Sequence, residues 1–379
     1  MIKQRVLISE VYEGLYDGPH ATPPTSDKGA VFLGISNITK NGHIDFSNIK
    51  YISEEDLPKW TKRVTPRAGD IVFSYEATLN LYAIIPESFW GCRGRRMALI
   101  RPDESKALGK YLYYYFFSDE WRATIAKNTV TGATVDRIPI AKFPEFPISL
   151  PSLEIQKRIV DILSAYDYLI ENNQKQIKLL EEAAQRLYKE WFVDLRFPGH
   201  EDVQIVDGVP EGWKQSKVTE LLEIKYGKDH KALEDGKIPV YGSGGVMRRV
   251  KQILYSGESV LIPRKGSLNN ILYVDCDFWT IDTMFYSIPR MKDVAKYSYL
   301  YLITRDMYSF NIGAAVPSMT TKILDGMDIL LPDETALAKF ETAVSPLFEK
   351  KKLLEKQNEQ LTEARDRLLP KLMSGEIEL

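Results

Sequence analysis

The chain has 379 residues, of which 44% are hydrophobic and 27% are charged, and its formal net charge is −2. This composition predicts a globular protein with two or three cores. The near-zero net charge means that any nucleic-acid surface must be local, because phosphate binding needs clustered lysine and arginine. Neither the two cysteines nor the four histidines show the spacing of a metal site or a disulfide framework. No uncharged run approaches the roughly 20 residues of a membrane helix, so we expect a cytoplasmic protein without a membrane partner.

Residues 1–150 are predicted to form a mixed α/β region. Short β-branched and aromatic runs such as AVFLGISNI and DIVFSY are separated by turn residues, which indicates strands. The stretch YLYYYFFSDEW, residues 111–121, is predicted to be a helix whose aromatic side chains belong to the core rather than to a base-stacking surface.

Residues 151–200 have a helical pattern. The residues that recur there at seven-residue steps are Ile159, Tyr166, Leu180 and Leu187, with Asn173 in the middle of the series. Heptad spacing favours a long helix with an apolar interface. Proline and serine in SLPSLEIQKRI are helix-start signals, and Pro198 with Gly199 is predicted to end the segment.

Residues 201–331 are predicted to form a second mixed region, after a domain boundary near GVPEGW. VLIPR and NILYVD indicate strands, and YSYLYLITRDMY indicates a helix. GDIVFSYEATLN in the first region and GESVLIPRKGSLNN in the second place a glycine, a strand and a polar loop at matching positions. No counterpart of GVPEGW precedes the first region.

Residues 332–379 repeat the helical pattern. The heptad positions are Phe340, Leu347, Leu354, Leu361 and Leu368. Because proline fits best at a helix start, Pro346 predicts a short helix over 334–345 and a long one over 346–369. Two surface helices, each packed on its own globular domain, are the alternative to helices that pair with each other.

The two halves of the chain are related by an internal repeat. GATV at 132–135 and GAAV at 313–316 are 181 places apart, and the same offset pairs residues without a gap to the end of the chain. Ile148, Leu150 and Pro151 meet Ile329, Leu331 and Pro332 at this offset. The repeat predicts internal pseudo-twofold symmetry.

Catalytic motifs for nucleic-acid chemistry are missing. No methyl-donor loop, no Asn/Asp-Pro-Pro-aromatic tetrapeptide and no GxxxxGK[ST] occurs, and GSGG at 242–245 is followed by no GK[ST]. This favours a non-catalytic chain. A DNA-modifying enzyme with unrecognised motifs and a structural coiled-coil adaptor are the alternatives from other classes.

The order of features resembles the specificity subunit of type I restriction-modification systems. The resemblance covers the whole chain and includes WF at the end of the central segment, the C-terminal RLLPKLMSGEIEL, DGPHATPP followed by FLGISNITKNGHID, and IPVYGSGG. It implies two α/β (α+β) target-recognition domains, 1–150 and 201–331. They are separated and joined by two long helices, in 151–200 and 332–379, that form an intramolecular antiparallel coiled coil.

The resemblance also implies the partners and the target. The partners are double-stranded DNA, two modification (methyltransferase) subunits and restriction subunits. S-adenosylmethionine and ATP with Mg²⁺ are expected on those subunits, and no cofactor is expected on this chain. The target is expected to be bipartite and asymmetric, because the two regions differ in sequence. A helix of about 24 residues is roughly 36 Å long, close to one turn of B-DNA, which suggests half-sites on successive turns.

Base edges are read by side chains with fixed donor and acceptor patterns, and here loops would supply them. Three basic clusters lie in such stretches, CRGRR at 92–96, MRRVK at 247–251 and PRKGS at 263–267. For each candidate the alternative is a turn residue or a surface charge. The candidates of the first region are His20, Ser36, Asn37, Thr39, Ser74, Tyr75, Thr78, Arg93 and Thr134, and those of the second are Tyr241, Ser243, Arg264, Lys265, Ser267, Asn269 and Ser318.

Overall fold

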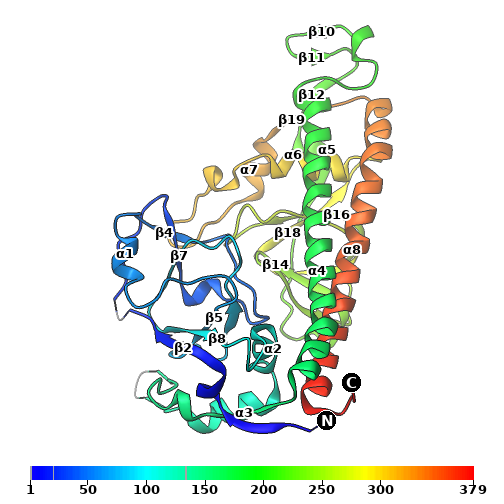
Figure 1. Ribbon diagram of the computed structural model, residues 1–379. Helices are drawn as coiled ribbons and strands as arrows, with labels where there is room; N and C mark the ends of the chain where they lie inside the picture. Colours follow the sequence, from blue (N-terminus) through cyan, green and yellow to red (C-terminus); the bar gives the residue numbers. More distant parts are fainter. Residues whose placement is uncertain (1, 20, 133–134) are drawn as a thin grey trace. The chain divides into compact units, whose positions relative to one another are not determined.

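The computed structural model describes residues 2–19, 21–132 and 135–379 (Figure 1). The chain divides into two compact units, one made of Met1–Asn172 with Gln357–Leu379 and the other of Asn173–Lys356. Each unit contains one mixed α/β region together with part of each of two long helices. In the part of the chain that the structure describes, no helix is both long and apolar enough to cross a membrane.

The first unit contains two small sheets and a separate strand pair. Its strands are β1 (Gln4–Leu7), β2 (Tyr12–Asp17), β3 (Ala30–Leu33), β4 (Lys50–Ile52), β5 (Ile71–Ser74), β6 (Tyr82–Ile84), β7 (Gly91–Arg93), β8 (Met97–Pro102) and β9 (Pro147–Leu150). The sheet orders are β2-β8-β5-β6 and β4-β3-β7, with β3 parallel to β7, and β1 pairs antiparallel with β9. The short helices are α1 (Leu57–Trp60), α2 (Gly109–Tyr115) and α3 (Asp119–Asn128).

Aromatic side chains of α2 form the core of the first unit, as predicted. Tyr111 and Tyr115 are fully buried and belong to one cluster with Ile71 and Phe73 of β5. Val72, between those two residues, points to the other face and joins a second cluster. Because both faces of this sheet are covered, β5 is apolar without the alternation of a half-exposed strand.

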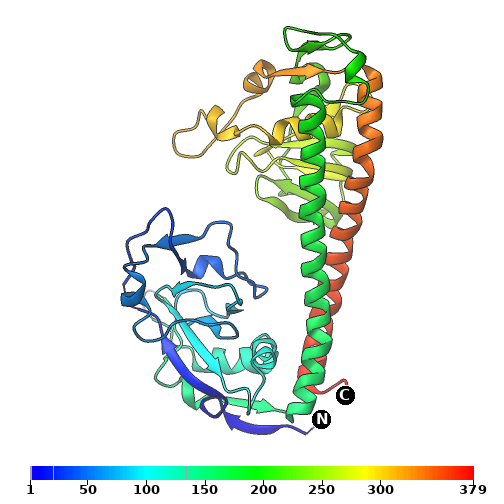
Figure 2. The same ribbon diagram turned by 45° about the horizontal axis from the view of Figure 1, so that its top comes forward.

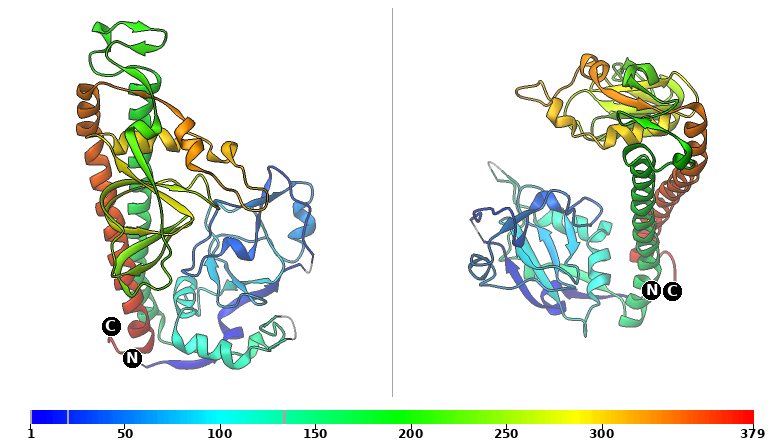
Figure 3. Two further views of the ribbon diagram at one scale, coloured as in Figure 1. Left: turned by 180° about the vertical axis from the view of Figure 1, so that it is seen from behind. Right: turned by 90° about the horizontal axis from the view of Figure 1, so that it is seen from above.

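The second unit has a single larger sheet, best followed in the left view of Figure 3. Its strands are β10 (Ile205–Val206), β11 (Val209–Pro210), β12 (Lys214–Lys217), β13 (Leu222–Tyr226), β14 (Asp235–Gly242), β15 (Gly245–Val250), β16 (Tyr255–Pro263), β17 (Leu272–Thr280), β18 (Met284–Pro289) and β19 (Asp328–Leu331). The order is β13-β18-β16-β17-β14-β15, and β12 pairs antiparallel with β19. The helices are α5 (Val218–Leu221), α6 (Ala295–Ile303) and α7 (Thr321–Gly326).

The start of the first region has a structural counterpart in the second. β1 pairs with β9 as β12 pairs with β19, and the partners Leu150 and Leu331 are 181 residues apart. Each of β1 and β12 leads through one helical turn into the first strand of its sheet. In the second region β12 is preceded by the β10–β11 hairpin and by Trp213, whose indole N–H donates to Asp333 at 3.1 Å.

The two long helices are α4 (Leu153–Tyr188) and α8 (Glu334–Ser374), which lie side by side in Figures 1 and 2. In the first unit Arg365 pairs with Asp167 at 2.7 Å, and in the second Lys351 pairs with Glu181 at 2.6 Å. Residue numbers in α8 fall as those in α4 rise, so the helices are antiparallel. The predicted pairing is therefore confirmed, and the alternative of unpaired surface helices is wrong.

The predicted break at Pro346 is wrong, because α8 is continuous over 41 residues. Pro346 is exposed, and so is Thr342, whose carbonyl loses its helical partner and can face water. Phe340 and Val344 before the proline and Leu347 after it pack in one core, which holds the two parts of the helix in line. The helices are also longer than the predicted 24 residues, so their length alone does not match one turn of DNA.

The helix–helix interface includes a second series of positions that the heptad series did not identify. Between the predicted positions of α4 lie the buried Leu163, Ile170 and Ala184. The corresponding positions in α8 include Lys351 and Arg365, which are charged and ion-paired. Polar residues at such positions favour one register and hide the apolar periodicity in the sequence.

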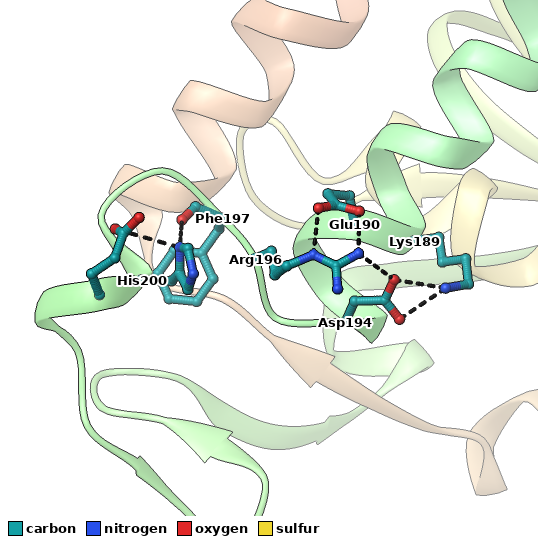
Figure 4. Close-up of polar contacts among 7 residues, drawn as sticks. Lys189, Glu190, Asp194, Arg196, Phe197 and His200 are labelled. Carbon is teal, nitrogen blue, oxygen red and sulfur yellow. Dashed lines mark hydrogen bonds and ion pairs between the residues drawn. The ribbon is translucent and has the colours of Figure 1, made fainter.

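α4 ends earlier than predicted, in a π-helical turn over Lys189–Val193. Figure 4 shows the ion pairs that hold this end. Asp194 accepts from Lys189 at 2.6 Å and from Arg196 at 3.1 Å, and Arg196 also pairs with Glu190. The hydrogen bond and charge of Lys189 lower the pKa of Asp194. Pro198 and Gly199 lie beyond the turn, so they follow the helix end rather than cause it.

Candidate DNA interface

In both units the repeated glycine segment is hydrogen-bonded to the loop that follows a central strand. In the first unit Ala77 N–H donates to the Asp136 carbonyl at 3.0 Å and Ile138 N–H donates to the Tyr75 carbonyl at 2.7 Å. In the second unit Gly266 N–H donates to Pro317 and Met319 N–H to Arg264, both at 2.9 Å. We call each pair of bonds a loop clasp. Residues 136 and 138 are 181 places before 317 and 319, so the sequence repeat includes the clasp.

The backbone at the clasp needs particular residues. The residues at its centre, Ala77 and Gly266, have φ values of 69° and 88°, in the left-handed region that glycine adopts without strain. A Cβ atom on Gly313 would lie 1.9 Å from the Val316 carbonyl oxygen, and one on Gly132 would lie 2.5 Å from that of Val135. Glycine is therefore required in GATV and in GAAV because the chain returns close to itself.

The second unit brings most of its candidates together at the clasp. A Cβ atom on Gly266 would lie 2.8 Å from Ser243 Oγ, and Lys265 forms a β-bridge with Ser318. The Arg264 guanidinium lies 5.5 Å from the centre of the Tyr226 ring. Lys265 and Ser267 are exposed, while Ser243, Arg264 and Ser318 are partly exposed.

Two candidates of the second region have other contacts. Asn269 accepts from Met307 N–H at 2.7 Å and donates to Asp306 at 3.1 Å, so its amide holds the loop. Tyr241 packs on Phe278 and lines a cavity of about 320 Å³ together with Cys276 and residues of α8. Burial raises the pKa of Tyr241 to about 12. Its side chain thus belongs to the packing of the sheet against α8.

In the first unit three loops lie at the clasp: those that follow β3 and β5, and the turn between β7 and β8. This turn contacts the other two, since Gly94 N–H donates to the Leu33 carbonyl at 2.7 Å and Tyr75 N–H donates to the Arg96 carbonyl at 3.0 Å. Ser36 and Thr78 are exposed there. Thr39 is partly exposed, and its hydroxyl donates to the His43 carbonyl at 3.0 Å.

Four candidates of the first region are buried and bonded inside the domain. Asn37 is 5% exposed, accepts from Gly34 N–H at 3.0 Å and donates to the Asp45 carbonyl at 3.2 Å. Ser74 accepts from Leu81 N–H at 3.2 Å, and the Tyr75 ring is buried in the core cluster that contains α2. Arg93 is 3% exposed and donates to the Asp17 carbonyl at 2.5 Å.

Burial of Arg93 lowers its pKa to about 10, although Asp17 opposes this shift. The candidates His20 and Thr134 lie outside the described residues.

The arginines of the CRGRR cluster differ in exposure, and the candidate Arg93 is the buried one. Arg95 is exposed, and Arg96 is partly exposed and pairs with Glu76 at 3.1 Å. Cys92 and Arg93 belong to the fully buried strand β7, whereas Arg95 lies in the turn after it. Arg137, which forms bridges with Glu76 and Val130, is a further exposed basic residue at the clasp.

The second basic cluster, MRRVK, is partly neutralised within the domain. Arg248 pairs with Asp235 at 2.5 Å, and Lys251 pairs with Glu234 at 2.7 Å. In contrast, no ion pair of Arg264 or Lys265 occurs among the described residues. Arg264 and Lys265 thus place positive charge beside the clasp that no carboxylate among the described residues neutralises.

Known proteins are similar to this chain over nearly its whole length. A family model, the type I restriction modification DNA specificity domain, matches residues 25–182 and again 210–363. The MjaIX specificity subunit of Methanocaldococcus jannaschii is 26% identical, over 88% of this chain and 85% of that protein. The HindI specificity subunit of Haemophilus influenzae is 22% identical, over 92% and 94%. The crystal structure of a type I S subunit from M. genitalium covers 98% of this chain and 96% of its own, with a TM-score of 0.57 and 19% identity.

The two matched stretches and the duplicated clasp define a DNA-recognition protein with two recognition regions. The chain belongs to the family of type I restriction-modification specificity subunits. It directs DNA target recognition and is a non-catalytic member of its complex. The alternatives of a self-contained enzyme and of a structural adaptor are thereby excluded.

Proposed function

We propose that each loop clasp presents one set of base-reading side chains, so that the chain recognises a bipartite, asymmetric target in double-stranded DNA. The observation that carries this proposal is the pair of equivalent backbone bonds at 136–138 and 317–319, which hold loops of different sequence. Identical frames give equivalent positions on DNA, and different side chains give different half-sites.

The residues that we assign to this role are the accessible ones around each clasp. The candidates left out are those whose side chains are buried or bonded inside the domain, namely Asn37, Thr39, Ser74, Tyr75, Arg93, Tyr241 and Asn269. The assigned residues of the first region are Ser36, Thr78, Arg95 and Arg137, and those of the second are Ser243, Arg264, Lys265, Ser267 and Ser318.

We further propose that one chain recruits two modification subunits, which carry S-adenosylmethionine, and that restriction subunits with ATP and Mg²⁺ join this complex. Two grooves support this stoichiometry. A groove of about 850 Å³ lies at the start of α4, lined by Leu153 and Ile155 among others. One of about 700 Å³ lies at the start of α8, lined by Glu334 and Ala338. Position 334 is the repeat equivalent of position 153.

Native mass spectrometry of the co-expressed complex tests the stoichiometry. We expect two modification subunits per chain, one with either Leu153→Arg or Ala338→Arg, and none with both substitutions. Both side chains are exposed, so neither change alters a core. A wild-type complex that holds a single modification subunit when that subunit is in excess would contradict the twofold argument. A double variant that still binds two would show that the grooves are not the docking sites.

A competition binding assay with the assembled complex tests whether the chain recognises two half-sites. Once the methylated target has been mapped, a duplex with either half-site scrambled should compete as poorly as non-specific DNA at the same salt concentration. Equal competition by a duplex that keeps only one half-site would contradict a bipartite reader.

A further inference from the structure

The loop at the second clasp carries two large apolar side chains on its surface. Ile312 is 63% exposed and Val316 is 55% exposed. The repeat places Thr131 and Val135 at the equivalent positions of the first region. Ala314 and Ala315 between them are exposed as well, so the loop presents an apolar tip, made mainly by Ile312 and Val316, beside Lys265 and Ser318.

This apolar tip is held by the fold. Asn311 Oδ1 accepts from Gly313 N–H and from Ser318 N–H, both at 2.8 Å. Ile312 N–H donates to the Ser318 carbonyl at 3.0 Å. The loop is thus closed on itself as well as clasped, and β-branched side chains are stiff at χ1. Ile312 and Val316 therefore lose little conformational freedom when they bind a surface.

Their chemistry selects what they can contact on DNA. Neither side chain donates or accepts a hydrogen bond, so a base donor or acceptor that faces them would be left unpaired. The apolar feature of a base edge in the major groove is the C5-methyl group of thymine. Arg264 and Lys265 next to the loop have the charge to bind phosphates and to bring the tip to the groove.

We propose that Ile312 and Val316 contact thymine methyl groups in the half-site that the second region reads, which rests on the function proposed above. The first region reads differently at the equivalent loop, because Thr131 can hydrogen-bond and Arg137 is exposed beside it. One clasp geometry thus supports apolar readout in one half-site and polar readout in the other.

The test uses the assembled complex with its modification subunits and duplexes in which one thymine at a time is replaced by deoxyuridine. This change removes only the methyl group and keeps the base pair. We expect about a fourfold loss of affinity for each contacted methyl group in the second half-site. The Ile312→Ser, Val316→Ser double variant should bind the thymine and deoxyuridine duplexes equally. The matched variant Val135→Ser should keep the loss.

The possible outcomes distinguish failure of the thymine contact from failure of the proposed DNA-reading function. If a scrambled second half-site abolishes binding but deoxyuridine has no effect anywhere in it, the thymine contact is wrong and the reader function stands. If scrambling has no effect, the reader function itself fails. An increase in 2-aminopurine fluorescence within the second half-site on binding, without a deoxyuridine effect, would show that the apolar side chains insert between stacked bases. That result would also overturn the methyl contact.

Discussion

The two recognition regions share a topology but differ in the continuity of one strand. In the second region β17 pairs antiparallel with β16 and, at its end, parallel with β14, so all six strands form one sheet. In the first region the corresponding run is divided into β6, which pairs with β5, and β7, which is parallel to β3. Pro86 lies in the interruption and cannot donate a backbone hydrogen bond to a neighbouring strand. The clasp is kept although the sheet is split, so the loop frame does not depend on one continuous sheet.

The regions also differ in how they attach to the long helices. In the first unit Tyr114 donates to Asp167 at 2.5 Å, and Arg365 of α8 donates to the same carboxylate at 2.7 Å. In the second, Lys296 of α6 donates to Glu258 at 2.8 Å and to Glu341 of α8 at 2.5 Å. The two regions are therefore joined to the long helices by different polar groups, and the sequence repeat is not kept at these positions.

The largest effect should come from charges placed in the two cores at equivalent positions. Leu163 and Val344 are 181 residues apart, and both are 0% exposed. Leu163→Asp and Val344→Asp should each lower the free energy of unfolding by about 4 kcal/mol or more, because the buried carboxylate has no partner. Limited proteolysis should show that the unit carrying the substitution is lost first. Leu179→Asp, at an exposed position, is the control and should change little.

The attachment of the second region should depend on pH through Lys296. Burial opposes the charge of Lys296, but hydrogen bonds to Glu258 and Glu341 outweigh burial, so its pKa is raised. A raised pKa in the folded state gives stability that is complete below the ordinary lysine pKa of 10.5 and lost as pH rises through the folded value.

Lys296→Met should therefore lower the free energy of unfolding by about 2 kcal/mol at pH 7, a value reduced because Glu258 is partly exposed. The difference from wild type should disappear above the raised pKa. Denaturant unfolding at pH 7, 9 and 11 measures it. A difference that grows at high pH would contradict the ion pairs, and Lys110→Met, on the exposed face of α2, is the control.

The two regions should contribute similar electrostatic terms to DNA binding. Lys265→Gln and Arg95→Gln each remove one exposed charge. Each should reduce the slope of log affinity against log salt by about one, because one positive charge is removed. Arg248→Gln, which removes an ion-paired charge, should leave the slope unchanged. A slope that changes for only one of the first two variants would show that the regions approach DNA differently.

The smallest effect should come from the clasp residues with positive φ. Gly266→Ala should lower the free energy of unfolding by about 1 kcal/mol, since a Cβ atom is unfavourable at φ 88°. Ala77→Gly should stay within about 0.5 kcal/mol, because relief of the same strain is offset by the greater freedom of the unfolded chain. Thermal unfolding of the two variants compares them. Equal losses would mean that the clasps are not equivalent.

The repeat, the two regions and the paired helices could be predicted because apolar spacing and the 181-residue offset survive in the sequence. The additional interface positions could not be predicted, since Lys351 and Arg365 are charged residues that tertiary ion pairs hold at the interface. Pro346 misled the prediction because packing on both sides overrides a local preference. Asn37 and Arg93 have the residue types of base readers, yet only the fold decides whether such groups bond to the backbone or face solvent.

The most direct test of two independent readers is exchange of one region. Residues 205–331 would be replaced by the equivalent region of another specificity subunit, and methylated bases would be mapped genome-wide in a host that also carries the modification subunits. We predict that one half-site changes while the other half-site and the spacer persist. A new target in which both half-sites differ would contradict two separate readers and would require a composite recognition surface.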